Sequence, residues 1–191
     1  MRVIAGSARS LRLSTPKGID TRPTADRIKE TLFNMIHPEL PGSIVLDLFA
    51  GSGGLGIEAL SRGAEHAYFI ENNHHAIKCI TENLLFTKLD GRATLLNLDA
   101  ISGIQYLSTL PELKDKYFRI LFIDPPYLKN HEKKILDLLA QQKYINSDTV
   151  IILETERGSD PAAFLNEAFF IEKKKKYKTN QHLFIKKART Q

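Results

Sequence analysis

Residues 43–60 read SIVLDLFAGSGGLGIEAL, an apolar run followed by a glycine-rich turn and a helical pattern. Gly51, Gly53 and Gly56 satisfy the spacing G-x-G-x-x-G directly after the predicted strand. Glycines there let the backbone turn tightly and approach a bound nucleotide closely. Glu71 ends the next predicted strand, where it can accept hydrogen bonds from ribose hydroxyls. The stretch therefore predicts a nucleotide-type ligand, with a tight turn that binds nothing as the alternative.

Strand and helix patterns alternate along the rest of the chain. Apolar runs predict strands at 43–49, 67–71, 93–98, 119–124 and 149–155. Helical patterns fall between them, at about 54–62, 73–88, 101–110 and 130–141. Continuous Val, Ile and Leu runs are typical of parallel strands covered on both faces. The alternation favours a doubly wound, mostly parallel α/β sheet.

The two ends of the chain depart from this alternation. Residues 2–13 predict a small hairpin around Gly6-Ser7-Ala8, and residues 25–37 predict a helix. We therefore expect an N-terminal extension over residues 1–40 ahead of the main domain at 41–191. At the other end, two β-like runs at 169–178 and 181–187 predict an antiparallel hairpin, whose four lysines suit an exposed edge strand.

Basic residues gather at both ends. Residues 1–30 carry seven basic and three acidic side chains, and residues 171–191 carry eight basic and one acidic. The net charges are +4 and +7, which leave −6 for residues 31–170. Basic ends around an acidic body favour a polyanion held by the ends, although solvated tails are the alternative. The candidate RNA-binding residues are Arg9, Arg12, Arg22, Arg27, Lys173, Lys174, Lys175 and Lys176.

Several protein classes are disfavoured by composition. The single cysteine, Cys79, excludes an internal disulfide framework and a cysteine-rich metal site, and no metal is expected. No apolar run approaches the about 20 residues of a membrane helix. The N-terminal residues are basic but too interrupted by polar side chains for a secretory signal. We expect a cytoplasmic monomer with no membrane partner.

Acidic residues lie at the C-terminal ends of three successive predicted strands: Asp47, Glu71 and Asp99. Ligands of open α/β sheets bind at this carboxyl edge. A dinucleotide such as NAD places its pyrophosphate on the helix N-terminus, where the Asp47 carboxylate would be unwelcome. The acids instead favour S-adenosylmethionine (SAM), which carries an ammonium and a sulfonium, with Asp99 placed to meet the adenine amino group. A dehydrogenase is disfavoured by Asp47.

The fourth predicted strand runs into Asp124-Pro125-Pro126-Tyr127. Two consecutive prolines keep the segment extended. The Asp124 carboxylate and the Pro125 carbonyl are then fixed acceptors for an exocyclic amine of a nucleobase, and the Tyr127 ring can stack on that base. A rigid strand exit with a core tyrosine is the alternative.

These motifs resemble the class I SAM-dependent methyltransferases that carry [Asp/Asn]-Pro-Pro-[Tyr/Phe], and within them the RsmD family of bacterial small-subunit rRNA guanine-N2 methyltransferases. The matching stretches are RPTADRIKETLFN (22–34), FAGSGGLGIEAL (49–60) and DPPY (124–127). The resemblance implies a Rossmann-like sheet of seven strands and SAM as methyl donor. It also implies, as acceptor, N2 of one guanine of 16S rRNA, of the guanine-966 type, within the small ribosomal subunit or its assembly intermediate.

The resemblance assigns roles to individual residues. It implies cofactor binding by Asp47, Gly51, Gly53, Glu71 and Asp99. We add Phe49, Gly56 and Ala100 as candidate cofactor-binding residues. It implies catalysis by Asp124, Pro125, Pro126 and Tyr127. The chain departs from the family at Ser10, where glycine is common, and at Lys176-Tyr-Lys-Thr179, where a Lys-Tyr-Gly-type turn is common. Both departures lie in the ends that are expected to hold RNA.

Two other functions stay open. An N6-adenine DNA methyltransferase could use the same Asp-Pro-Pro-Tyr chemistry, but such enzymes usually carry a target-recognition insertion for which this chain has no room. A non-catalytic nucleotide- or RNA-binding module would not need the complete Asp-Pro-Pro-Tyr segment.

Overall fold

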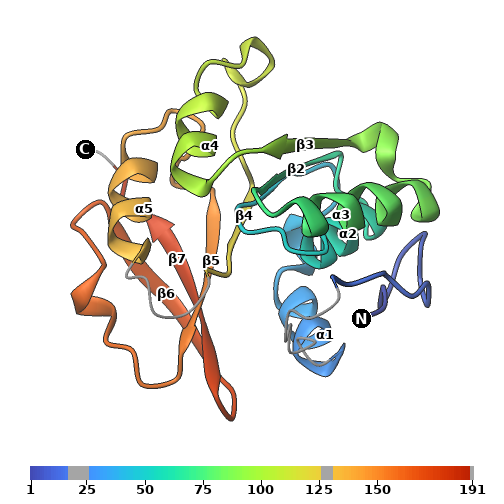
Figure 1. Ribbon diagram of the computed structural model, residues 1–191. Coiled ribbons are helices and arrows are strands. Elements are labelled where there is room, and N and C mark those ends of the chain that lie inside the picture. Colours follow the sequence, from blue (N-terminus) through green and yellow to red (C-terminus); the bar gives the residue numbers. More distant parts are fainter. Residues whose placement is uncertain (17–25, 126–130, 190–191) are drawn as a thin grey trace.

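A seven-stranded sheet forms the centre of the molecule, with strand order β3-β2-β1-β4-β5-β7-β6 (Figure 1). The computed structural model describes residues 1–16, 26–125 and 131–189. The strands are β1 (Ile44–Asp47), β2 (His66–Glu71), β3 (Ala93–Asn97), β4 (Ile120–Ile123), β5 (Val150–Glu156), β6 (Phe169–Lys176) and β7 (Asn180–Lys187). Strands β1 to β5 pair in parallel, whereas β7 is antiparallel to both β5 and β6. The predicted mostly parallel sheet with an antiparallel C-terminal hairpin is confirmed.

Helices lie at the predicted places, one ahead of β1 and the others between successive parallel strands. They are α1 (Asp26–Met35), α2 (Gly54–Ser61), α3 (His74–Thr87), α4 (Ala100–Leu107) and α5 (His131–Ala140). Single 3-10 turns lie at His37–Glu39, Asp90–Arg92, Pro111–Leu113 and Pro161–Ala163. Among the described residues, no helix has both the length and the apolar character needed to cross a membrane.

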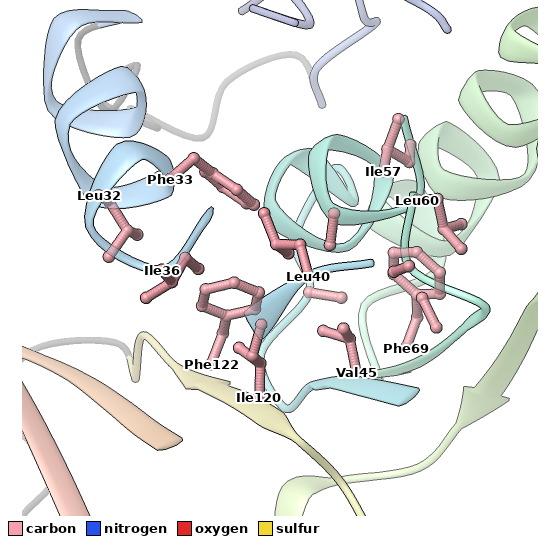
Figure 2. Packing of buried hydrophobic residues seen from close by; sticks show 14 of the residues in the cluster. Leu32, Phe33, Ile36, Leu40, Val45, Ile57, Leu60, Phe69, Ile120 and Phe122 are labelled. Carbon is pink, nitrogen blue, oxygen red and sulfur yellow. The ribbon is translucent and has the colours of Figure 1, made fainter. Parts of the chain in front are cut away.

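Both faces of the sheet are covered, because alternate residues of each strand point to opposite sides. Val45, Phe69 and Phe122 face α1 and α2, and the Phe33 ring of α1 lies 5.6 Å from that of Phe122 (Figure 2). The next residue in β1, Leu46, belongs to the other core layer, which includes side chains of α4 and α5. Figure 1 shows these two helices on one side of the sheet and α1, α2 and α3 on the other. The sheet is therefore doubly wound, as predicted.

The N-terminal segment packs on the same core. Val3 and Leu13 are buried in the layer that contains α1 and α2. The expected hairpin is reduced to an isolated antiparallel β-bridge between Arg2 and Arg12, and neither half of it forms a β-strand. Ser10 has a φ of 69°, the left-handed conformation that glycine adopts without strain, at the position where the resembling family commonly has glycine.

Strand β6 forms one edge of the sheet, as its four lysines predicted. It pairs with β7 on one side, and Lys173 to Lys176 are exposed. The pairing with β7 shifts register between Ile171 and Lys173, which is a β-bulge or a similar irregularity. Charged side chains and bulges both discourage pairing of an edge strand with another chain.

Candidate active site

The strand order reverses between β1 and β4. Asp47 at the end of β1 is in register with Phe122 of β4, and the Leu48 N–H donates to the Phe122 carbonyl over 3.0 Å. The segments that leave β1 and β4 therefore start next to each other at the carboxyl edge of the sheet. Open α/β sheets bind their ligands at such a switch point.

The glycine turn is held by Asp47. Gly53 precedes α2 with a φ of 80° and has no side chain to cap the helix. The Asp47 Oδ2 accepts a hydrogen bond from the Gly56 N–H at 3.0 Å, so the strand supplies the missing cap. A side chain at Gly56 would collide with the Phe69 ring. The third glycine of the motif thus lets α2 pack closely on β2.

Asp47 is costly to ionise in this position. The residue is 2% exposed, and burial raises the pKa of its carboxyl to about 7. The Gly56 hydrogen bond acts in the opposite direction, and the Glu71 charge adds to the rise. A positive ligand at this edge would favour the ionised form.

Glu71 closes the turn from β2. Its Oε2 accepts from the Gly51 N–H at 2.8 Å, and its Oε1 accepts from the N–H groups of Asn72 and Asn73, both at 2.9 Å. The predicted juxtaposition of this acid and the glycine turn is therefore present. Phe49, between β1 and the turn, is half-buried against the layer that includes α4.

Asp99 lies two residues beyond the end of β3, and not at the strand end as predicted. It caps α4, because its Oδ1 accepts from the backbone N–H groups of Ile101 and Ser102 at 3.0 and 3.1 Å. Its Oδ2 accepts from the Ser102 hydroxyl at 2.6 Å, and these bonds hold its pKa below the usual range. The Asp99 carboxylate is exposed, so an oxygen lone pair is still available to a ligand. Ala100, the first residue of α4, is buried.

Asp124 and Pro125 follow β4 directly and lie at the switch point. Asp124 is half-buried, between the buried residues Ile123 and Pro125. Burial, then Glu154, then Asp47 raise the pKa of the Asp124 carboxyl to about 8. Pro126 and Tyr127, which complete the predicted catalytic segment, lie outside the described residues.

Glu154, on the strand next to Asp124, and its cross-strand partner His182 escaped the sequence analysis. Glu154 is near the end of β5. The sequence analysis selected acids at the carboxyl ends of three other strands, and the same criterion could have found Glu154. Its Oε1 accepts from the Asn180 side chain at 2.6 Å, and its Oε2 lies 3.0 Å from the His182 Nε2. His182 could not have been found, because its approach to Glu154 depends on the pairing of β5 with β7.

The candidate RNA-binding residues in the described part of the chain are exposed. They are Arg9, Arg12, Arg27, Lys173, Lys174, Lys175 and Lys176. Arg22 lies outside the described residues. The exposed side chains present positive charge to solvent from the N-terminal segment, from α1 and from the edge strand β6.

A doubly wound sheet with a glycine turn after β1 and an Asp-Pro-Pro-Tyr segment after β4 defines a Rossmann-like, SAM-dependent methyltransferase. The family described as "Conserved hypothetical protein 95" matches residues 1–186. The Bacillus subtilis protein named "Putative rRNA methyltransferase YlbH" is 41% identical over 82% of this chain and 83% of its own length. "Ribosomal RNA small subunit methyltransferase D" of Escherichia coli is 35% identical over 82% of this chain and 75% of its own.

The solved structure "Putative methyltransferase yhhF from Escherichia coli" has the same architecture. It is 29% identical, covers 98% of this chain and 97% of its own, and superposes with a TM-score of 0.81. The chain belongs to the family whose model matches residues 1–186, that of the RsmD-type methyltransferases.

Proposed function

We propose that this chain transfers a methyl group from SAM to the N2 amine of a guanine in 16S rRNA, of the guanine-966 type. One observation carries the proposal: the glycine turn after β1 and the Asp124-Pro125 segment after β4 start side by side at the switch point. A methyl donor held by the turn and an amine held by the segment would then lie within reach of each other.

The residues around the turn suit SAM. Glu71 is at the β2 end, where ribose hydroxyls of a bound nucleoside are expected, and the buried Asp47 favours a positive ligand. The adenine would lie toward Asp99 and Ala100, and the glycines and Phe49 would line the site between. The proposed cofactor-binding residues are Asp47, Phe49, Gly51, Gly53, Gly56, Glu71, Asp99 and Ala100.

The Asp124-Pro125 segment suits an exocyclic amine. The nitrogen lone pair of such an amine is delocalised into the ring, so the nitrogen is a poor nucleophile. Acceptors at the Asp124 carboxyl and the Pro125 carbonyl would hold the two N–H groups and favour attack by the lone pair on the methyl carbon. The carbon–sulfur bond breaks with its electron pair left on sulfur. The nitrogen then loses one proton.

The partner and setting belong to the same proposal. The relatives named for the small ribosomal subunit, together with the exposed basic residues, support rRNA in that subunit or its assembly intermediate as the partner. We assign RNA contact to the N-terminal extension over residues 1–40 and to β6, and methyl transfer to residues 41–191. The chain would act in the cytoplasm as a monomer.

Single-turnover methylation at saturating SAM, with the modified base mapped on the rRNA, tests the proposal. Asp124→Asn keeps one acceptor oxygen and is expected to retain measurable activity. Asp124→Ala removes it and is expected to slow turnover on the order of 10²-fold or more. Tyr127→Phe is expected to be mild, whereas Tyr127→Ala removes the stacking ring and is expected to be severe.

Two results would contradict the proposal. If Asp124→Ala methylates rRNA as fast as the parent, the chemistry takes place elsewhere. If the methyl group is found on N6 of adenine in DNA and not on guanine N2 of rRNA, the alternative enzyme is the correct one.

A further inference from the structure

Asp124, Glu154 and His182 lie in one row across three neighbouring strands. Ile123 pairs with Leu153 across β4 and β5, so the next residues, Asp124 and Glu154, follow side by side. Glu154 pairs directly with His182 across β5 and β7. Direct cross-strand partners point to the same face of a sheet. The row therefore continues the face of Phe122, which lies two residues before Asp124 and packs under α1.

His182 is held on both of its ring nitrogens. The side chain is 2% exposed, its Nε2 lies 3.0 Å from the Glu154 Oε2, and its Nδ1 lies 3.3 Å from the Tyr177 hydroxyl. Burial raises the pKa of Tyr177 to about 12, so the hydroxyl keeps its proton. With the His182 tautomer that carries its proton on Nε2, this hydroxyl is the donor to Nδ1. We assign the proton on Nε2 to the bond with Glu154. With the Asn180 amide on Oε1, both Glu154 oxygens accept hydrogen bonds, as an ionised carboxylate requires.

We propose that Glu154, oriented by His182, Tyr177 and Asn180, is a positioning residue that makes its neighbour Asp124 the acceptor of the proton lost by the methylated amine. This inference rests on the proposed function. Glu154 touches neither the base nor the methyl donor and acts only through Asp124.

The proton balance is simple. Once the nitrogen–carbon bond has formed and the sulfur has taken the electron pair, the nitrogen carries a positive charge. Its N–H proton passes to the Asp124 carboxylate, which becomes a neutral carboxyl and returns the proton to solvent as product leaves. A fixed negative charge at Glu154 favours the protonated form of Asp124, because two like charges in a half-buried site repel.

The surroundings of the row support this arrangement. Burial and the Glu154 charge are the two largest causes of the raised pKa of Asp124, and Asp47 on β1 is the third. Lys175 on β6 pairs with His182, at the far end of the row from Asp124. On α1, Phe33 packs on Phe122 and brings no charge to that contact. Among the described residues, the acid of β5 that lies next to Asp124 is therefore Glu154, and hydrogen bonds from Asn180 and His182 hold its side chain in place.

A carboxyl titration tests the coupling without any RNA. In the full chain labelled with ¹³C at the aspartate carboxyl carbons, the Asp124 signal is identified by its loss in Asp124→Asn. Glu154→Gln is expected to lower the titration midpoint of Asp124 by on the order of one pH unit. Glu156→Gln, which changes an exposed acid of the same strand, is the matched control and is expected to leave that midpoint unchanged. An unchanged midpoint in Glu154→Gln overturns the inference.

Kinetics provide the second readout. The single-turnover rate on rRNA is expected to rise with pH through the Asp124 titration, to shift with it in Glu154→Gln, and to lose this rise in Asp124→Asn. His182→Gln still offers an amide donor to Glu154 and is expected to keep the parent profile, whereas His182→Leu is expected to shift it as Glu154→Gln does. A purely structural role would change rates without moving the profile, and that result would also overturn the inference.

The two readouts separate the inference from the proposed function. If the carboxyl midpoint shifts but the parent does not methylate guanine N2, the proposed function fails while the Glu154–Asp124 coupling stands. If the parent methylates guanine N2 but the midpoint does not shift, only the inference fails. Should Glu154→Gln not fold, His182→Leu and His182→Gln decide the question in the same titration.

Discussion

Asp47 shows how a single buried carboxyl serves a turn and a ligand site together. Its Oδ2 caps α2 through the Gly56 N–H, although its burial disfavours the charge that makes such a cap strong. Glu71 and Asp124 add further acids at the same edge. The site therefore concentrates negative charge where a positive methyl donor is expected, and the folded protein is destabilised when that donor is absent.

This cost predicts a pH dependence of stability. The folded pKa of Asp47 is about 7, above its ordinary value of 3.8, so the folded state binds more protons between those values and stability falls as pH rises through that window. Asp47→Asn keeps an acceptor oxygen and removes the charge. In urea unfolding without ligand, we expect it to match the parent near pH 4 and to gain about 1–4 kcal/mol relative to the parent at pH 8.

Asp115→Asn, at an exposed site, is the control. It is expected to leave the slope of the free energy of unfolding against pH unchanged. Asp124, whose pKa is also raised, accounts for the decline that stays in Asp47→Asn. If the free energy of unfolding falls equally steeply with pH in Asp47→Asn and in the parent, ionisation of Asp47 does not destabilise the folded protein.

At the scale of elements, polar side chains join the N-terminal segment to the helices. Glu58 on α2 accepts from the backbone N–H groups of Ile4 and Ala5 and pairs with Lys29 of α1 at 3.0 Å and with Arg62 at 2.7 Å. The side chains of Lys29 and Glu58 are both 0% exposed. This cluster fixes α1 and the first residues of the chain to the helix that carries the glycine turn.

A second polar bridge reaches the turn from α3. The Asn83 side chain accepts from the Ser14 N–H at 2.8 Å and donates to the carbonyls of Ser14 and Ser52, each at 2.9 Å. The N-terminal segment and the glycine turn therefore share one amide. The proposed RNA-binding extension is thereby tied directly to the proposed cofactor site.

Removing one partner of the buried pair is expected to be strongly destabilising. Glu58→Gln leaves the Lys29 ammonium buried without its countercharge and should cost about 3–5 kcal/mol in urea unfolding. The double variant Lys29→Met, Glu58→Gln should cost less than the sum of the two single changes, because no uncompensated charge is left. The exposed pair of Lys78 and Glu82, changed in the same way, should cost less than about 1 kcal/mol. Additive costs at the buried pair would contradict this account.

At the scale of the whole molecule, charge is separated by position. The acidic residues of the candidate site lie at the carboxyl edge of the sheet, whereas the lysines of β6 lie on the edge strand farthest from β3. A strand edge with four exposed lysines can follow a phosphate backbone without contributing to the core. This separation supports one surface for RNA and another for the methyl donor.

The edge strand is expected to govern the salt dependence of RNA binding. Replacing Lys173, Lys174, Lys175 and Lys176 by glutamate should weaken binding to 16S rRNA, and the slope of log K against log salt should fall by about one for each phosphate that is no longer neutralised. SAM binding should be unaffected. The matched control replaces Lys114, Lys116, Lys133 and Lys134, also exposed, with the same change in charge. If both quadruple variants alter the slope equally, the effect is one of net charge and not of β6.

Much of the fold could be predicted because it is encoded in contiguous residues. The apolar runs and the glycine turn with Gly53 and Gly56 act over a few residues, so they are readable without knowing what lies nearby. The same holds for the position of Asp124-Pro125 directly after β4, because the apolar run of the strand and the following prolines are contiguous in the chain. Asp99 was predicted at the end of β3, but it caps α4 two residues further on. The sequence does not distinguish these two positions, whereas the hydrogen bonds from the Ile101 and Ser102 N–H groups identify Asp99 as the cap.

The sequence by itself determined the strand–helix alternation, the position of the glycine turn and the presence of acids after the strands, since period and turn chemistry are local properties. Tertiary structure alone decided which of these acids meet. Glu154 reaches His182 only through the register of β5 with β7, and Lys29 reaches Glu58 only because α1 packs on α2. The raised pKa of Asp47 likewise comes from burial, which depends on every layer around it. Pairing between distant segments and exclusion of water are properties of the assembled chain, and they turn a row of separate acids into a site.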